Sequence, residues 1–253
     1  MQTIFSPQNI IKPDKHTSPK LLISYSNIII NFLPTMKATT PFKSLTLYGC
    51  ANSSASWRVR IALDWKNMQY EHALINIYKG AHKEQGFEKI NPMRQIPALE
   101  VDGKNLIPES LPICLFLEDT VPLRPLLPQD AVQKAQILAF CEMINSGIHP
   151  KIVMSVANRV EELGLNRADW MKYWINKGYQ SLEMYLEKTR GKYCFGDNIT
   201  LADAYFLPMT ENGIAKFGLE IGNFPLVNEL LQNLRDVPEL QNSYPKNQPD
   251  FGK

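Results

Sequence analysis

The sequence lacks the short motifs by which several large enzyme classes are recognised. It contains no GxGxxG, GKS, GKT, HExxH or GxSxG pattern, so nucleotide-binding, zinc-peptidase and serine-hydrolase functions have no support. Its four cysteines (Cys50, Cys114, Cys141 and Cys194) lie far apart, form no CxxC pair and join no Cys/His cluster with zinc spacing. We therefore expect neither a disulfide framework nor a metal site, and a reducing compartment fits the chain best.

An excess of charge of one sign is also missing. The 27 basic and 25 acidic residues give a formal net charge of +2, and no dense block of Lys and Arg occurs. A nucleic-acid partner is therefore not expected. The 253 residues allow one large domain or two of ordinary size, and a hydrophobic content of 44% is enough for a packed core.

Acidic residues are nearly absent from the first 44 residues, which contain Asp14, five lysines and no arginine. The apolar stretch 21–34 is too short and too polar to cross a membrane, so no membrane partner is expected. A Ser-rich leader with few acids is typical of an organelle transit peptide, although the lack of arginine argues against one, and an extension before a start at Met36 is the alternative. We place 1–43 outside the fold and expect a cytoplasmic protein, or an organellar one if this leader is a transit peptide.

Strand and helix signals alternate over 44–120 and then give way to helix signals alone. Three prolines in 121–130 predict a linker, and 131–253 is expected to be helical, with Thr200 and Asp203 at capping-box spacing before an apolar helix. The predicted fold is a small α/β domain of order β-α-β-α-β-β-α followed by an all-helical domain. Its expected elements are a strand at 45–49, a helix from Ser56 or Trp57, a strand at 70–76, a short helix at 84–89, a hairpin over 96–108 turning at Asp102-Gly103, and a helix at 109–120.

Small polar residues stand at the first strand-to-helix junction, in "GCANSSASWRVRIAL" (49–63). Ser53 and Ser54 fall near the helix N-terminus, where unpaired N–H groups and the helix dipole favour an anion. A serine hydroxyl there can donate to a bound thiolate and keep it ionised. The alternative is that Ser54 or Ser56 only caps the helix.

Two further junctions carry suitable groups for a peptide-like ligand. Ile96-Pro97 stands where a strand begins, and a cis bond there would present the backbone of Ile96 for strand-like pairing, whereas the alternative is an edge strand that starts with proline. Glu109 could accept from an ammonium, while Ser110 and the following helix N-terminus bind a carboxylate, which suits the γ-glutamyl end of glutathione. For this pair a simple helix start is the alternative.

The segments "SSASWRVRIAL", "KINPMRQIPALEVDG", "SGIHP" and "KNQPD" resemble the zeta class of the glutathione transferase family, and the resemblance runs from about 45 to 250. It implies a thioredoxin-like domain followed by a helical domain, a homodimer and glutathione as cofactor. It also implies that Ser54 is the catalytic hydroxyl with Ser53 beside it. Arg58 and Arg60 match the class pattern, and for Arg58 we favour a structural ion pair over a role in the site. The glutathione-binding residues that it implies are Ile96, Pro97, Glu109 and Ser110, with His82 and Gln95 as weaker candidates for the glycyl end.

The sequence departs from the class pattern at positions around the substrate. The cysteine of the usual Ser-Ser-Cys motif is replaced by Ala55, and the arginine before it by Asn52. A ligand-contacting glutamine aligns with Ile152, and a substrate-facing arginine with Lys216. Since arginine grips a carboxylate with two hydrogen bonds and lysine offers only a point charge, the substrate half of the site is expected to be less polar.

The resemblance implies a reaction on a small electrophile. In this class, the thiolate of glutathione adds to an activated cis double bond, the bond rotates, and elimination gives the trans isomer. The class substrate, maleylacetoacetate, is a dicarboxylate from tyrosine breakdown, whereas the departures favour a less charged substrate, such as a specialised metabolite, or a changed reaction. The alternatives are conjugation or dehalogenation of small electrophiles, or a protein that binds glutathione or another ligand without catalysis.

Overall fold

A four-stranded sheet forms the first part of the fold, within the residues 41–252 that the computed structural model describes. Its strands lie in the order β2-β1-β3-β4, with β2 parallel to β1, β3 antiparallel to β1, and β4 antiparallel to β3. The leader predicted at 1–43 lies outside the described residues, except for 41–43. The strands are β1 (Leu45–Gly49), β2 (Glu71–Leu74), β3 (Ala98–Val101) and β4 (Asn105–Pro108).

The hairpin between β3 and β4 turns at the predicted pair, Asp102 and Gly103. Both residues have positive φ angles, 55° and 69°. A type I′ turn needs positive φ at both central positions, and its twist matches that of the paired strands. The Asp102-Gly103 pair in the sequence therefore correctly predicts the turn between β3 and β4.

The short helix predicted at 84–89 is confirmed only over its second half, as a 3-10 turn. The structure has two short 3-10 turns in this region, Ala81–Lys83 and Phe87–Lys89. Gly80 and Gly86 precede them with φ angles of 79° and 101°. These left-handed residues interrupt the backbone, so a continuous helix cannot form.

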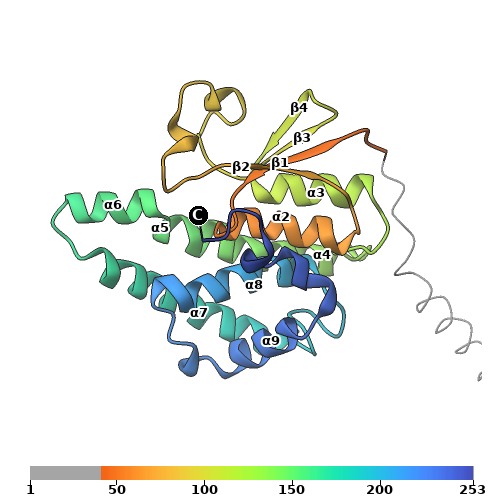
Figure 1. The fold of residues 1–253 in the computed structure, drawn as a ribbon. Helices are drawn as coiled ribbons and strands as arrows, with labels where there is room; N and C mark the ends of the chain where they lie inside the picture. Colours follow the sequence, from red (N-terminus) through yellow and green to blue (C-terminus); the bar gives the residue numbers. More distant parts are fainter. Residues whose placement is uncertain (1–40, 253) are drawn as a thin grey trace, which may run out of the picture. The chain divides into compact units, whose positions relative to one another are not determined.

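Helix α2 (Ser54–Trp65) is the central element of the described fold. It lies along the sheet beside α3 (Ser110–Thr120), and Figure 1 shows helices of the C-terminal part on its other side. Because neighbours surround it, even Arg58 and Arg60 are completely buried. The N-terminus of α2 consequently lies where the sheet meets the helices.

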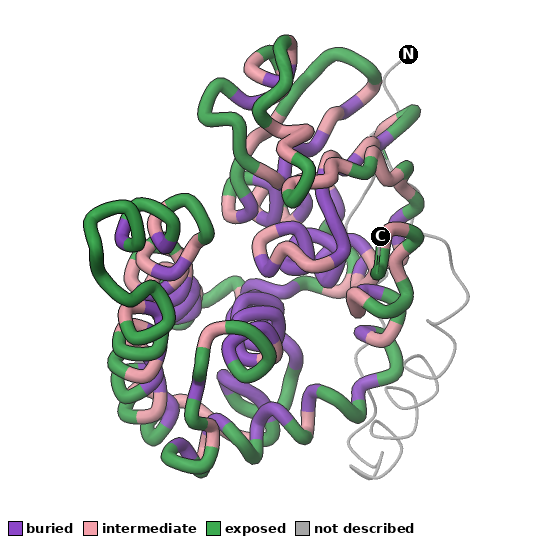
Figure 2. Tube along the Cα trace, turned by 60° about the vertical axis from the view of Figure 1, so that its left-hand side comes forward, coloured by how far each residue is buried: buried purple, intermediate pink, exposed green. Residues whose placement is uncertain are grey.

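Helices form the rest of the described chain, as predicted. Beyond β4, the only strand-like pairing among the described residues is an isolated bridge between Arg190 and Gly196. Within 41–252 no helix is long and apolar enough to span a membrane. Figure 2 shows buried residues on the inward sides of these helices and exposed residues outside. The helices are α4 (Ala131–Glu142), α5 (His149–Ile152), α6 (Met154–Glu162), α7 (Arg167–Thr189), α8 (Leu201–Asn212) and α9 (Pro225–Arg235), with π-helical turns at Met143–Ile148 and Gly213–Phe217 and 3-10 turns at Ile221–Asn223, Pro238–Ser243 and Pro245–Asn247.

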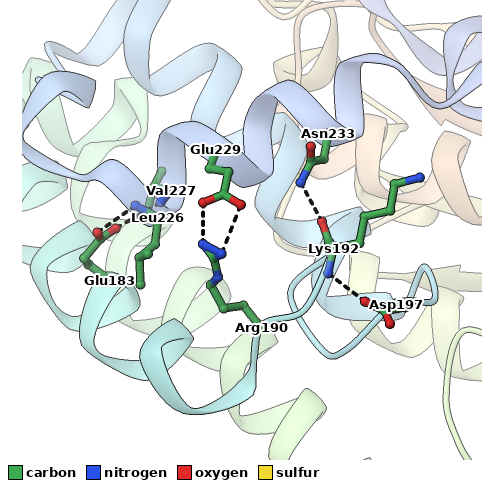
Figure 3. Close-up of polar contacts among 8 residues, drawn as sticks. All are labelled: Glu183, Arg190, Lys192, Asp197, Leu226, Val227, Glu229 and Asn233. Atoms are coloured by element: carbon green, nitrogen blue, oxygen red, sulfur yellow. Dashed lines mark hydrogen bonds and ion pairs between the residues drawn. The ribbon is translucent and has the colours of Figure 1, made fainter.

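Polar contacts fasten α9 to the C-terminal half of α7, as Figure 3 shows. The Glu183 carboxylate accepts from the N–H groups of Leu226 and Val227, at 2.8 and 3.0 Å, and so caps the N-terminus of α9. Arg190 donates to Glu229 through two nitrogens, at 2.6 and 3.0 Å. These contacts supplement the apolar packing between the two helices.

Residues 121–130 contain neither helix nor strand, as the prolines predict. A buried cation fixes this segment, because Lys66 Nζ donates to the carbonyls of Val121 and Leu123 at 2.8 and 3.3 Å. Lys66 also pairs with Glu118 at 2.8 Å. Residues 41–252 belong to one compact unit, so the domain boundaries at 44–120, 121–130 and 131–253 stay predictions.

Candidate functional site at the N-terminus of α2

A tight turn connects β1 to α2. It is closed by a hydrogen bond from the Ser53 N–H to the Cys50 carbonyl, at 3.3 Å. Gly49 precedes the turn, and a Cβ there would stand only 2.9 Å from Ser56 Oγ, so the close approach requires glycine. Helix α2 then begins at Ser54, two residues earlier than the first of the predicted starts.

Ser53 is the residue that caps α2. Its Oγ accepts a hydrogen bond from the Ser56 N–H at 3.2 Å, whereas the sequence pointed to Ser54 or Ser56 as the cap. Within residues 41–252, the N–H groups of Ser54 and Ala55 have no hydrogen-bond partner, and neither has the Ser53 hydroxyl hydrogen. Ser53 is half-buried. One hydroxyl and two N–H groups are thus available to an anion at the positive end of α2.

Ser54 points away from this opening, into the contact with α8. It is only 4% exposed, and its Oγ accepts from Asn212 Nδ2 at 2.8 Å. The same hydroxyl donates to the Pro208 carbonyl at 3.5 Å, which is a long hydrogen bond. Ser54 therefore connects the turn to the helical part of the chain.

Two charged residues hold the turn from the other side. Arg60 donates to the carbonyls of Cys50 and Ala51, at 3.0 and 2.8 Å. Burial lowers the pKa of Arg60 to about 10, so it stays protonated near neutral pH. Asp250, in the C-terminal segment, accepts from the Ala51 N–H at 2.9 Å. The backbone of the turn is thus fixed by residues far away in the sequence.

The second junction lies at the start of β3. The Ile96-Pro97 bond is cis, as the sequence suggested. The Glu109 N–H donates to the Pro97 carbonyl at 3.2 Å, which brings the two predicted junctions together. Glu109 is exposed and has a φ of 72°, a conformation that residues other than glycine rarely adopt and that is frequent at functional sites. Its carboxylate is free to meet an ammonium group from solvent.

Ser110 begins α3 and is only 3% exposed. Its hydroxyl lies 3.3 Å from Arg58 Nη1 and 3.2 Å from the Tyr205 hydroxyl, so it faces inward. A ligand carboxylate at this helix start would therefore meet backbone N–H groups of α3, because the hydroxyl is engaged with Arg58 and Tyr205. The sequence did not reveal this orientation.

Arg58 has a structural role, as we favoured. Its guanidinium donates to Asn145 Oδ1 at 2.8 Å and lies 4.4 Å from the ring centre of Tyr205. Burial lowers the pKa of Arg58, and no carboxylate among residues 41–252 forms an ion pair with it. Its charge is balanced by dipoles and an aromatic ring, so the ion pair itself is not present.

His82 and Gln95 lie in the segment between β2 and β3. His82 Nδ1 is buried and has no hydrogen-bond partner among residues 41–252, and burial lowers the pKa of His82. This orphaned nitrogen suits a polar ligand group. Gln95 is exposed, and its carbonyl accepts from Asn91 Nδ2 at 3.0 Å.

The four positions that depart from the class pattern are placed differently from one another. Asn52 and Ala55 belong to the turn and the first turn of α2, and the exposed Lys216 donates to the Asn52 carbonyl at 3.3 Å. Ile152 is fully buried in the hydrophobic core, so its side chain is not accessible to a substrate. A cavity of about 170 Å³ adjoins the turn and is lined by Cys50, Asn52, Leu74, Asn76, Tyr78 and Asp250.

Sequence reasoning missed Asn212 and Asp250 as site residues. Asn212 is the last residue of an apolar helix. The only sequence signal for its role is its side-chain amide, because a buried amide needs a hydrogen-bond partner. Asp250 lies in the closing "KNQPD" segment, which the resemblance covered without assigning a contact. No cluster of His, Cys, Asp and Glu in the described part of the chain is arranged to hold a metal ion.

Comparison with known proteins gives a consistent answer. Residues 52–120 match the N-terminal domain of glutathione S-transferases, and residues 148–246 match their C-terminal domain. A zeta-class glutathione S-transferase of Euphorbia esula is 36% identical over 81% of this chain and 92% of its own length. The chain belongs to the zeta class of the glutathione S-transferase family. Its fold class, a thioredoxin-like part followed by helices, is confirmed.

The chain is also similar to proteins named maleylacetoacetate isomerase. A probable maleylacetoacetate isomerase 2 of Drosophila melanogaster is 37% identical over 81% of this chain and 89% of its own length. The structure of a maleylacetoacetate isomerase from Anaeromyxobacter dehalogenans, solved with glutathione in its active site, superposes with a TM-score of 0.76. It is 31% identical and covers 82% of this chain and 98% of its own. These two isomerases thus match this chain over nearly all of the described fold.

Proposed function

We propose that this protein is a glutathione-dependent isomerase that converts an activated cis double bond in a small electrophile to the trans form. The observation that carries the proposal is the open N-terminus of α2. There, the Ser53 hydroxyl and the N–H groups of Ser54 and Ala55 have no acceptor among residues 41–252 and can donate to an anion. The similarity to maleylacetoacetate isomerases supports it.

The proposed glutathione site has one group suited to each part of the molecule. The open N-terminus of α2 suits the thiolate, and the exposed Glu109 suits the ammonium group. The N-terminus of α3 at Ser110 suits the α-carboxylate, and the backbone of Ile96 suits the peptide portion. The orphaned His82 nitrogen suits the glycyl end, with Gln95 nearby in sequence. When bound, glutathione supplies the thiol nucleophile that adds reversibly to the double bond.

We propose Ser53, rather than Ser54, as the hydroxyl that donates to the thiolate. The supporting observation is that Ser53 keeps its hydrogen unused and is half-buried, whereas Ser54 is almost completely buried against α8. A donor at a helix N-terminus lowers a thiol pKa because it stabilises only the ionised form. The same N–H groups then stabilise negative charge that develops nearby during the reaction.

The substrate half of the site is proposed to include Asn52 and Lys216. Lys216 uses one of its three N–H donors on the Asn52 carbonyl, so the others remain for an anionic substrate group. Ile152 is a poor candidate for substrate contact because it is fully buried. With one cation and no arginine at these positions, conjugation of a less polar electrophile is the second candidate reaction.

Two further expectations are proposals as well. The family resemblance supports a homodimer. Cytoplasmic location is supported by the four cysteines, which are all buried and unpaired, and import into an organelle through 1–43 is the alternative.

The test is to incubate the full chain with maleylacetone, with and without glutathione. We expect the absorbance of the cis isomer to disappear only when glutathione is present, and this loss to be about 100-fold slower in Ser53→Ala. Accumulation of a stable adduct would favour conjugation instead. Tight binding of glutathione without turnover of any unsaturated carbonyl compound would favour a carrier and contradict the proposal.

A further inference from the structure

Asn212, the last residue of α8, reaches across to the turn that begins α2. Its side chain is only 5% exposed. Nδ2 donates to Ser54 Oγ at 2.8 Å and to the Asn52 carbonyl at 3.3 Å. One amide group therefore holds the residues on both sides of Ser53.

The orientation of this amide follows from its partners. A backbone carbonyl can only accept, so the nitrogen of Asn212, and not its oxygen, must face Asn52. The same nitrogen then donates to Ser54 Oγ, which leaves the Ser54 hydrogen to point toward the Pro208 carbonyl. Ser54 is consequently fixed as a bridge between the turn and α8.

Asn212 completes the support of the turn. Arg60 holds the carbonyls of Cys50 and Ala51, but it does not reach that of Asn52. The Asn52 carbonyl is held only from the α8 side, by Asn212 and by the exposed and flexible Lys216, among the residues that the structure describes. Asn212 is the rigid one of these two partners, because it is buried and short.

We infer that Asn212 is a positioning residue that holds the turn so that the Ser53 hydroxyl and the N–H groups of Ser54 and Ala55 converge on one point. This inference rests on the proposed function, since the point is the proposed thiolate site. It extends that function by assigning the geometry of the glutathione site to a residue of the C-terminal part of the chain. Asn212 itself need not touch glutathione.

The central experiment compares Asn212→Ala and Asn212→Asp with the unchanged protein. The thiol pKa of bound glutathione is measured from the ultraviolet absorbance of its thiolate as a function of pH. We expect a rise of about one unit in Asn212→Ala, because the donors lose their alignment. The rise should be larger in Asn212→Asp, whose carboxylate cannot donate to the Asn52 carbonyl and places negative charge beside the site.

A second readout needs no glutathione. Amide hydrogen exchange of Ser53 and Ser56 reports whether the turn and its cap stay closed, since both N–H groups are bonded within it. We expect exchange about tenfold faster in both Asn212 variants, as follows from losing hydrogen bonds of ordinary strength. A variant that only loosened the core would not shift exchange at these two positions selectively.

The matched control is Asn233→Ala. Asn233 also donates its amide to a backbone carbonyl, that of Lys192 at 2.9 Å, on the far helix α9 (Figure 3). We expect its thiol pKa and its exchange at Ser53 and Ser56 to equal those of the unchanged protein. If Asn212→Ala does not fold, amide exchange at Ser53 and Ser56 in the nearly isosteric Asn212→Asp decides the question, because the added negative charge would raise the thiol pKa even with the turn in place.

The two hypotheses fail in different ways. An unchanged thiol pKa and unchanged exchange in a folded Asn212 variant would overturn the positioning role. A bound thiol that titrates in the unchanged protein as it does in free solution would contradict the proposed function, while the exchange measurement would still decide whether Asn212 holds the turn.

Discussion

The N-termini of α2 and α8 are both capped by a hydroxyl residue, but they differ in how many hydrogen-bond donors remain unused. At α8, Asp203 Oδ2 accepts from the Thr200 N–H and hydroxyl at 2.8 and 3.0 Å, and its Oδ1 accepts from the Cys194 N–H at 2.9 Å. Two N–H groups of the first turn of α8 are also engaged, because that of Leu201 donates to the Leu126 carbonyl at 2.8 Å and that of Asp203 to the Thr200 carbonyl at 3.1 Å. At α2, Ser53 satisfies one N–H group and two remain open. A closed cap stabilises the fold, whereas an open cap is ready for a ligand.

The largest expected effect concerns the closed cap. Asp203→Ala removes three hydrogen bonds from a fully buried position and leaves buried donors unsatisfied. We expect the free energy of unfolding to fall by about 3 kcal/mol or more in urea denaturation. The folded fraction should still bind glutathione with an unchanged thiol pKa. A loss below about 1 kcal/mol would contradict the structural reading of this cap.

The open cap should give the opposite pattern in Ser53→Ala. We expect kcat to fall about 100-fold, because the thiolate loses its hydroxyl donor. The stability loss should be only about 1 kcal/mol, the usual cost of a lost N-cap. Ser54→Ala is the matched comparison: it should lower kcat less, through the turn alone. If Ser54→Ala abolished turnover and Ser53→Ala did not, the roles of the two serines would be reversed.

The other end of α2 predicts a pH effect. Burial raises the pKa of Asp64 from 3.8 to about 7, although Arg60 opposes the rise. Because the folded-state pKa is raised, the unfolded chain ionises first, and stability is lost as pH rises from about 4 through about 7. Asp64→Asn should therefore be more stable than the unchanged protein at about pH 8 by about 1–2 kcal/mol, a figure reduced for partial exposure.

Urea denaturation at several pH values checks this effect. The difference between Asp64→Asn and the unchanged protein should vanish below about pH 4, where the carboxyl is protonated in both states. A difference that did not change with pH would show that the substitution acts through packing and not through ionisation.

The smallest expected effect comes from a contact far from both caps. Arg190 and Glu229 form a bidentate ion pair that is partly exposed. Glu229→Gln should lower the free energy of unfolding by about 0.5 kcal/mol, and less at high salt, since water screens such pairs. Thermal unfolding at two salt concentrations measures it. A loss above about 2 kcal/mol would mean that this ion pair stabilises the packing of α9 more than is expected for two partly exposed side chains.

Local signals predicted much of this fold. The Asp102-Gly103 turn and the Thr200–Asp203 spacing act over a few residues, so the sequence alone identifies the hairpin and the closed cap. The start of α2 was missed because three nearby serines are all good N-cap residues. Ser54 is engaged in tertiary contacts with α8, and Ser53 is therefore the residue that caps the helix.

The support of the site could not be predicted in the same way. Asn212 and Asp250 reach the turn from 158 and 199 residues away along the chain, so no local pattern announces them. For the same reason the inward orientation of Ser110 depends on Tyr205, which the sequence places in an ordinary apolar helix. The residues proposed to bind a ligand were visible in the sequence, whereas Asn212 and Asp250, which hold the turn in place, were not.

The most direct test of the open cap follows amide chemical shifts while glutathione is added to the full chain. The account predicts the largest shifts at the N–H groups of Ser54 and Ala55, and none at those of Leu201 and Ala202 at the start of α8. Shifts centred elsewhere, with Ser54 and Ala55 unmoved at saturation, would contradict the claim that the N-terminus of α2 holds the thiolate.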